Sequence, residues 1–175
     1  MKEKWKTWWW YHRVHVLIAV VAAAIILYSF LPGILAPKPD CSVAVISLSG
    51  MPDEIMASLE ERFQLAAEDV NGDGRVLIEM NLYMADLSGE TPGTLNYSEA
   101  AKLDADLVGN YSSILLIDDP EGFSSNTVTP IEPAVLCSSL SFFDGLALPE
   151  GMVFTIRSDS AAIWQNLYTN ILTDR

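Results

Sequence analysis

The sequence predicts a transmembrane helix followed by a single three-layer α/β domain with a mainly parallel sheet. Residues 14–31 form an apolar run of 18 residues without a charge. At about 1.5 Å per residue this run makes about 27 Å of helix, which matches one hydrocarbon core. After residue 41, short apolar runs rich in β-branched residues alternate with helical stripes. This alternation is typical of an α/β fold.

The residues before the apolar run predict the orientation of the anchor. They carry four basic side chains against one acidic side chain, and aromatic rings crowd the start of the run. Positive flanks remain in the cytoplasm, and tryptophan and tyrosine rings favour the headgroup region. We therefore expect a cytoplasmic leader at 1–13, a signal anchor in the cell membrane at 14–36, a stalk at 37–41 and an extracytoplasmic domain at 42–175.

A cleaved signal peptide is the alternative interpretation of the same residues. Its apolar region normally has about 7–15 residues and ends at a small-x-small cleavage site. The run here is longer, and the residues before Pro37 lack a small residue at the outer position of such a site. Retention as an anchor is therefore favoured, and Pro32, Gly33, Pro37 and Pro39 are expected to form a short stiff stalk that ends the helix.

The first half of the domain predicts two strand–helix units and a third strand. Each expected strand is a short apolar or alternating run, and each expected helix repeats apolar residues every three or four positions. Right-handed crossovers make the three strands parallel. We expect strands at 42–48, 76–84 and 113–118, joined by helices at 53–69 and 96–108.

The pattern weakens after Pro120, where prolines, glycines and serines are frequent. We expect mainly loop at 120–150, with short strand pieces at 134–142. A returning strand at 152–156 and a final helix complete the domain. The apolar stripe of that helix comprises Ile163, Leu167 and Ile171.

The charge differs sharply between the two ends of the chain. Residues 1–36 have a net charge of +3, whereas the remainder carries six basic and 22 acidic side chains, a net charge of −16. Such a domain repels nucleic acid and anionic lipid. The expected partners are the lipid bilayer and either another envelope protein or a small polar ligand, and no nucleic acid.

Residues 69–75, Asp-Val-Asn-Gly-Asp-Gly-Arg, match the first half of a calcium loop. Asp69, Asn71 and Asp73 would supply side-chain oxygens, and Arg75 a backbone carbonyl. Met80 stands where an EF-hand has its bidentate glutamate, so a distant acid would have to complete a Ca²⁺ site. The alternative is a solvated turn, because Asn-Gly and Asp-Gly are strong turn formers.

Two further groups of side chains are candidates for a site. Cys41 and Cys137 are the only cysteines, and outside the cytoplasm they permit one disulfide; the alternative is two buried free thiols. Ser49 follows the first expected strand, and Asp118, Asp119 and Phe123 follow the third. Because open α/β sheets bind ligands at the carboxyl edge, these four residues are candidate ligand-binding residues. A capped loop start is the alternative for the two acids.

No catalytic motif accompanies these candidates. The only histidines, His12 and His15, flank the start of the apolar run. A Ser-His-Asp or Cys-His device therefore cannot be built in the domain. No phosphate-binding glycine motif is present. We expect no enzymatic activity, and a carboxylate-based hydrolase ranks last because no pair of acids is marked out.

Several blocks of sequence carry a resemblance. They are a Trp-Trp-Trp-Tyr leader, a helix ending in Asp-Val-Asn-Gly-Asp-Gly-Arg-Val, and an Ala-Ala-Lys-Leu-Asp-Ala-Asp-Leu helix leading to Ile-Leu-Leu-Ile-Asp-Asp. In these features the chain resembles uncharacterised single-pass, membrane-anchored proteins of gut clostridia. Residues 42–122 are also similar to one lobe of the extracellular solute-binding proteins of transporters. Those proteins have two lobes, and this chain is expected to form one.

We therefore expect a membrane-anchored, extracytoplasmic binding or interaction module of the cell envelope. One alternative is a single-lobed solute-binding accessory of a transporter, with a pocket lined by Ser49, Asp118 and Phe123. The other is a calcium-stabilised structural domain.

Overall fold

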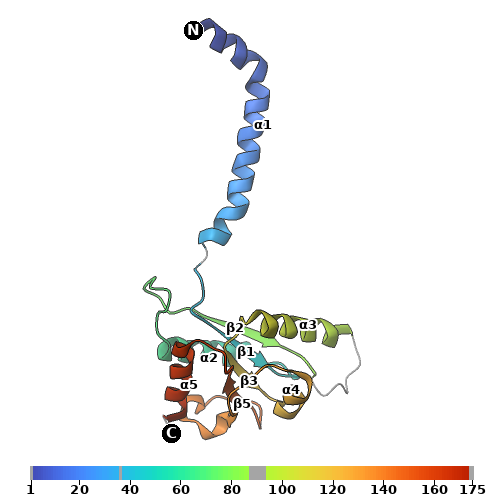
Figure 1. Cartoon of the computed structure of the whole chain (residues 1–175), viewed down its shortest axis with the longest axis vertical. Coiled ribbons are helices and arrows are strands. Elements are labelled where there is room, and N and C mark those ends of the chain that lie inside the picture. The colour runs from blue at the N-terminus through green and yellow to red at the C-terminus, as the bar shows by residue number, and fades with distance from the viewer. Residues whose placement is uncertain (1, 36, 87–93, 174–175) are drawn as a thin grey trace. The chain divides into compact units, whose positions relative to one another are not determined.

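The computed structural model describes residues 2–35, 37–86 and 94–173 (Figure 1). The chain divides into two compact units, Met1–Lys38 and Pro39–Arg175. The first unit is one helix. The second contains a sheet and the remaining helices.

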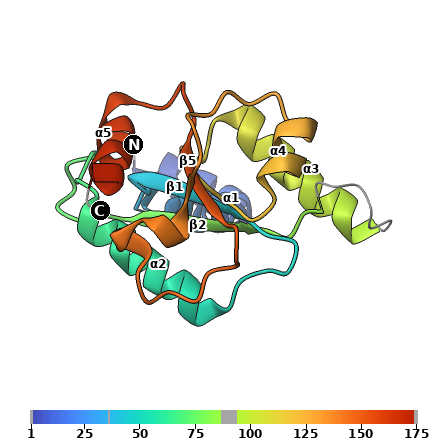
Figure 2. The same cartoon turned by 90° about the horizontal axis from the view of Figure 1, so that it is seen from below.

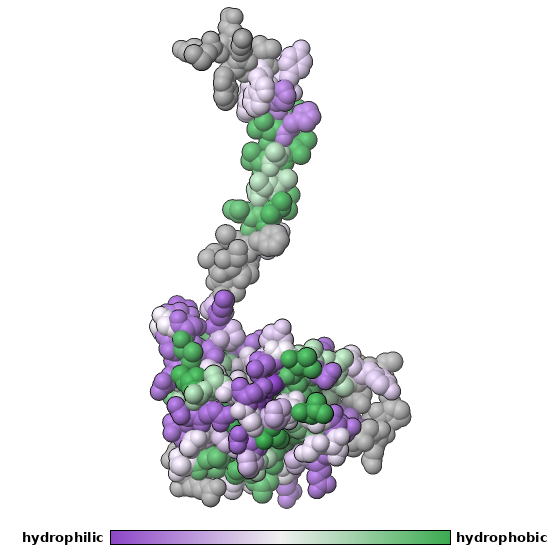
Figure 3. All heavy atoms as spheres, viewed as in Figure 1, coloured by the Kyte–Doolittle hydropathy of each residue, from purple (hydrophilic) through white to green (hydrophobic). Residues whose placement is uncertain are grey.

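Helix α1 spans Lys2–Leu35. Its segment Trp8–Ser29 has a mean hydropathy of 1.8 and is not buried, so it is long and apolar enough to cross a membrane. Figure 3 shows apolar side chains along the middle of α1. α1 continues through Pro32 and Gly33 and ends at Leu35, before Pro37 and Pro39, so only the second half of the expected stalk lies beyond the helix. Membrane helices tolerate such interruptions.

The second unit is built on a five-stranded sheet with the strand order β2-β1-β3-β5-β4. β1 (Cys41–Ile46) pairs in parallel with β2 (Ile78–Tyr83) and with β3 (Ile114–Ile117). β5 (Val153–Ile156) is antiparallel to β3, and β4 (Val135–Leu136) is antiparallel to β5. Of these strands only β5 runs in the opposite direction, so the predicted mainly parallel sheet is confirmed.

Helices cover both faces of the sheet, which gives the predicted three layers (Figures 1 and 2). One face packs against α2 (Asp53–Ala66) and α5 (Ala162–Thr173). The other face packs against α3 (Thr94–Gly109) and α4 (Pro120–Asn126). Two short 3₁₀ helices, η1 (Cys137–Ser139) and η2 (Ser141–Phe143), add to the α2–α5 side.

Each face of the sheet buries its own hydrophobic cluster. On the α2–α5 side, rings of Phe63, Phe143, Phe154 and Tyr168 pack with centroids 5.1 to 6.5 Å apart, the spacing of favourable aromatic pairs. Every residue of β1, β3 and β5 is buried. Successive strand side chains alternate between two covered faces, and this is why these strands are nearly continuous apolar runs.

The sequence pattern did not predict α4, because residues 120–126 were expected to be loop. Pro120 occupies the start of this helix, and the Asp119 side chain accepts a hydrogen bond from the Gly122 amide at 2.9 Å. An aspartate cap followed by proline is a recognised helix-start signal. The signal lies in a stretch whose serines and later prolines favour loop.

Candidate functional site

The predicted carboxyl-edge residues come together only in part. β1 and β3 are neighbours, and the Leu48 amide donates a hydrogen bond to the Asp118 carboxylate at 3.1 Å. The Ser47 hydroxyl lies 3.3 Å from the Ser49 hydroxyl and donates to the Gly50 carbonyl at 3.2 Å. The bond from Leu48 to Asp118 therefore joins the ends of the two strands, whereas the serine hydroxyls bond within the turn after β1.

The other two predicted ligand-binding residues have structural roles. Asp119 caps α4, and a side chain at Gly122 would meet the capping carboxylate at 2.1 Å. Phe123 is fully buried in the core under α3 and α4. It cannot line a surface pocket, so the expectation of a pocket formed by Ser49, Asp118 and Phe123 is corrected.

The loop at 69–75 is held by its own backbone amides. The Asp69 carboxylate accepts hydrogen bonds from the amides of Gly72 and Gly74, at 2.7 and 2.8 Å. The side-chain oxygens of Asn71 and Asp73 each accept from the amide two residues further on, at 2.9 Å. Both glycines have positive φ angles, +73° and +82°, which glycine adopts at little cost.

A further carboxylate, Asp40, ties this loop to the start of β1. It accepts hydrogen bonds from the amides of Val70, Asn71 and Leu77, at 2.9, 3.0 and 2.9 Å. Partial burial acts to raise the pKa of Asp40, but these amides outweigh it and hold the pKa below its ordinary value.

The described residues contain no group of three or more His, Cys, Asp or Glu side chains that could hold a metal ion. Arg75 is exposed, and its amide donates to Asp73. A turn capped by its own side chains accounts for the sequence pattern. Calcium binding by Asp69, Asn71 and Asp73 stays a prediction.

The two cysteines are buried free thiols, so the disulfide that the sequence permits is not formed. Cys41 begins β1 at the amino edge of the sheet, whereas Cys137 follows β4 and donates its amide to Met152 at the carboxyl edge. β3 and β5 separate β1 from β4, a distance of about 14 Å at 4.8 Å per strand. A disulfide needs Cα atoms closer than about 7 Å. Burial raises the pKa of both thiols to about 12, which makes them unreactive.

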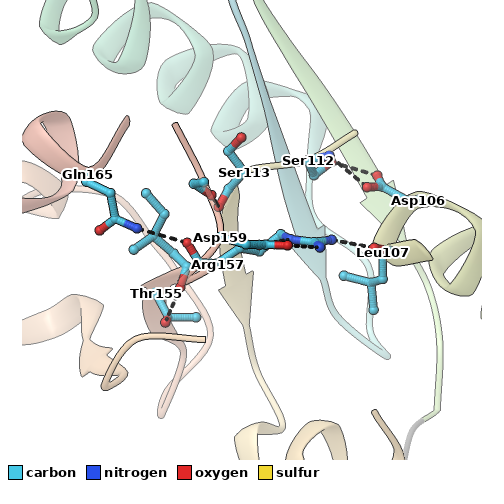
Figure 4. Close-up of polar contacts among 10 residues, drawn as sticks. Asp106, Leu107, Ser112, Ser113, Thr155, Arg157, Asp159 and Gln165 are labelled. Atoms are coloured by element: carbon cyan, nitrogen blue, oxygen red, sulfur yellow. Dashed lines mark hydrogen bonds and ion pairs between the residues drawn. The ribbon is translucent and has the colours of Figure 1, made fainter. Parts of the chain in front are cut away.

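The side chains of a buried polar cluster beside the C-terminal end of α3 form hydrogen bonds with one another and with nearby backbone groups (Figure 4). Asp106 accepts hydrogen bonds from the Ser112 amide at 2.8 Å, from the Ser112 hydroxyl at 2.6 Å and from the Tyr83 hydroxyl. Burial raises the pKa of Tyr83, and its bond to Asp106 raises the pKa further. The cluster joins α3 to β2 and to the start of β3.

Arg157 forms the second half of this cluster. Its guanidinium donates to both carboxylate oxygens of Asp159 at 3.0 Å and to the Leu107 carbonyl, and its own carbonyl accepts from Gln165 (Figure 4). Arg157 is buried, and its hydrogen bond to Asp159 lowers the pKa of that carboxyl. The guanidinium therefore forms its hydrogen bonds within the fold, which indicates that the cluster stabilises the domain.

A surface groove that the sequence did not indicate lies between α3 and the end of α4. We call it the α3–α4 groove, and its volume is about 430 Å³. α3 and α4 lie on the same side of the sheet (Figure 2). The described residues that line it come from three places: Tyr97, Ala100, Ala101, Leu103, Asp104 and Leu107 on α3, Asp86 after β2, and Asn126 and Thr127 at the end of α4.

The α3–α4 groove has an apolar base and a polar rim. Leu103 and Leu107 belong to the buried core beneath it, whereas Tyr97 and Asp104 are exposed. Alanines at positions 100 and 101 leave space where larger side chains would fill the groove. The arrangement suits a ligand with a short apolar part and a polar group.

Part of this site could have been read from the sequence. Tyr97, Ala101 and Asp104 recur at helical spacing, and Tyr97 and Ala101 belong to the apolar stripe expected for the second helix. The other wall was hidden, because α4 was expected to be loop.

Comparison with known proteins found no match to a protein-family model, a curated protein or a solved structure. The geometry of the domain and the apolar helix α1 therefore provide the basis for its function.

Proposed function

We propose that this protein is a binding module of the cell envelope, held at the membrane by α1, with the α3–α4 groove as its ligand site. The observation that carries the proposal is the groove itself, at about 430 Å³. Small-molecule sites are hollows of about 300–1,000 Å³ with apolar walls and a few polar groups. The groove has both properties.

The position of the groove in the fold supports the same proposal. Asp86 comes shortly after the carboxyl end of β2, and ligands of open α/β sheets bind outside the carboxyl ends of the strands. Between β1 and β3 that edge carries the hydrogen bond from Leu48 to Asp118. The α3–α4 groove lies between two helices on one side of the sheet, and its lining includes Asp86.

The anchor supports a role at the membrane surface. The basic residues precede the apolar segment Trp8–Ser29, and such flanks remain in the cytoplasm. We propose that the domain lies outside, where tethering raises the local concentration of a weak binding site. Protease added to intact cells should then remove a tag at the C-terminus. Protection of the tag until the cells are permeabilised would contradict this orientation.

We propose binding without catalysis. Both histidines belong to α1, and the buried Asp106 and Arg157 are engaged in bonds within the fold. A groove that only binds needs no activated nucleophile or proton-transfer group.

The experiment uses the full chain in lipid nanodiscs, with labelled alanine and leucine methyl groups observed by NMR. Three probes of similar size differ in charge: 2-phenylethanol, 2-phenylethylammonium and 3-phenylpropionate. Saturable shifts of the methyl signals of Ala100, Ala101 and Leu103 with any of these probes support the proposal. The methyl signals of Leu59, in the core of the opposite face, should not move.

A matched pair of variants locates the binding. Ala101→Phe fills the groove, whereas Ala105→Phe places the same ring on the same helix outside the described lining. We expect Ala101→Phe to abolish the shifts and Ala105→Phe to preserve them. The proposed site is refuted if none of the three probes gives saturable shifts.

A further inference from the structure

We infer that the ligand of the α3–α4 groove is a small organic cation, an ammonium group on a short apolar or aromatic stem. The inference deepens the proposed function and rests on it. It adds the charge and the chemical class of the ligand, which the volume of the groove leaves open.

The charge of the groove is negative, which favours a cationic ligand. Asp86 and Asp104 both line it, and none of its described lining residues is basic. Asp86 is only 7 % exposed, so this residue is largely shielded from bulk water. Asp104 is exposed and makes no hydrogen bond or ion pair with any described residue. A cleft lined by charges of one sign concentrates ligands of the opposite sign.

The surroundings strengthen this preference. Lys102, the basic residue of α3, forms an ion pair with Glu99 at 2.5 Å and is not among the residues lining the groove. The chain after residue 36 has a net charge of −16. An anionic ligand would therefore approach against both the local and the overall charge.

The hydrogen bonds within the rim favour a ligand that donates hydrogen bonds. The Thr127 hydroxyl uses its one hydrogen in a bond to the Phe123 carbonyl at 2.9 Å, and the Asn126 amide donates to the Gly122 carbonyl at 3.0 Å. An ammonium group has three donors and no acceptor. It fits a rim whose hydroxyl donor is already engaged and whose exposed acid, Asp104, can accept hydrogen bonds.

The remaining walls suit the stem of such a ligand. Tyr97 is 78 % exposed beside the groove, and tyrosine rings attract cations within about 6 Å of the ring centre. Leu103 and the alanines at 100 and 101 provide apolar contact. The groove is a local hollow of about 430 Å³, which lies within the range of about 300–1,000 Å³ of small-molecule sites. A small molecule is therefore the occupant we assign.

The three probes of the nanodisc experiment test the inference directly. We expect 2-phenylethylammonium to bind about tenfold more tightly than 2-phenylethanol, and 3-phenylpropionate to bind weakest of the three. Raising the salt concentration should weaken binding of the ammonium probe and leave binding of the alcohol unchanged.

A matched pair of acid variants tests the role of Asp104. Asp104→Asn should weaken binding of the ammonium probe about threefold, in the range of an exposed ion pair, with no change for the alcohol. Glu61→Gln removes one negative charge from an exposed position on α2, on the opposite side of the sheet, and should leave both affinities unchanged.

The outcomes separate the two proposals. Equal affinity for the three probes, or tighter binding of the propionate, overturns the inference of a cationic ligand but leaves the groove as a binding site. The inference is also overturned if Asp104→Asn and Glu61→Gln have the same effect. Failure of all three probes to shift the groove methyl signals refutes the proposed site itself.

Discussion

Asp106→Ala removes the carboxylate that holds the C-terminal end of α3 to the start of β3. That carboxylate accepts hydrogen bonds from the amide and the hydroxyl of Ser112, at 2.8 and 2.6 Å (Figure 4). It also accepts a hydrogen bond from the Tyr83 hydroxyl. Ser112 is fully buried. Water therefore cannot easily replace the lost acceptor.

The size of the effect follows from these bonds. A buried donor left without an acceptor costs about 1–3 kcal/mol, and Ser112 loses the acceptor for two donors at once. Removal of a buried carboxylate offsets part of this cost, because a charge no longer has to be kept out of water. We expect the free energy of unfolding to fall by about 3 kcal/mol and the melting temperature to fall by about 10 °C.

Thermal unfolding of the full chain in detergent micelles, followed by circular dichroism, measures this change. Asp104→Ala is the matched control, since it removes the same side chain two residues earlier on the same helix. Asp104 is exposed and has no hydrogen bond to a described residue, so its loss should change stability by less than about 0.5 kcal/mol. If Asp106→Ala melts within about 3 °C of Asp104→Ala, the role assigned to the Asp106 carboxylate is wrong.

Three further predictions concern the thiols, Asp40 and the loop. Cys41 and Cys137 should not react with a thiol reagent at pH 8 until the protein is unfolded, because burial raises their pKa to about 12; labelling of the folded protein would contradict this. The pKa of Asp40 is lowered by folding, so its stabilisation is present above the unfolded pKa of about 3.9 and is lost as pH falls through the lower folded value. Asp40→Asn should therefore lower the melting temperature at pH 7 and reduce the loss of stability below pH 4. If the melting temperatures of the variant and the unmodified protein fall equally steeply below pH 4, the role assigned to Asp40 is refuted. For the loop, the self-capped turn predicts the same melting temperature in EDTA and in millimolar calcium, whereas a calcium-dependent rise abolished by Asp73→Ala would establish the calcium site.

Local pattern was sufficient for the elements that lie in the core. β1 and β3 are continuous apolar runs because both faces of each strand are covered. In α2, Leu59 and Phe63 lie four residues apart, at the helical repeat, and both are fully buried. The predicted end of the second helix is also confirmed: α3 ends at Gly109, and Asn110 follows with a φ of +55°, a conformation that asparagine tolerates.

Features that depend on distance in space could not be read from the sequence. An even number of cysteines permits one disulfide in an oxidising location, but the sheet order places β3 and β5 between β1 and β4, the strands next to Cys41 and Cys137. In the same way, the oxygen-rich loop matches a calcium motif, yet its carboxylates accept backbone amides and Asp40 joins them from the start of β1. The sequence shows which side-chain atoms are present, but which partners these atoms bind depends on the fold.

The candidate site illustrates this limit most clearly. The rule that ligands bind at the carboxyl edge predicts a site near Ser49 and Asp118, where the Leu48 amide bonds to Asp118. Asp119 caps α4 and Phe123 anchors it in the core, so residues expected to bind a ligand instead hold the helix whose end forms one wall of the α3–α4 groove. A substitution at Asp119 or Phe123 would therefore weaken ligand binding indirectly, by displacing Asn126 and Thr127. Loss of binding in such variants would be accompanied by loss of stability, whereas Ala101→Phe should affect binding alone.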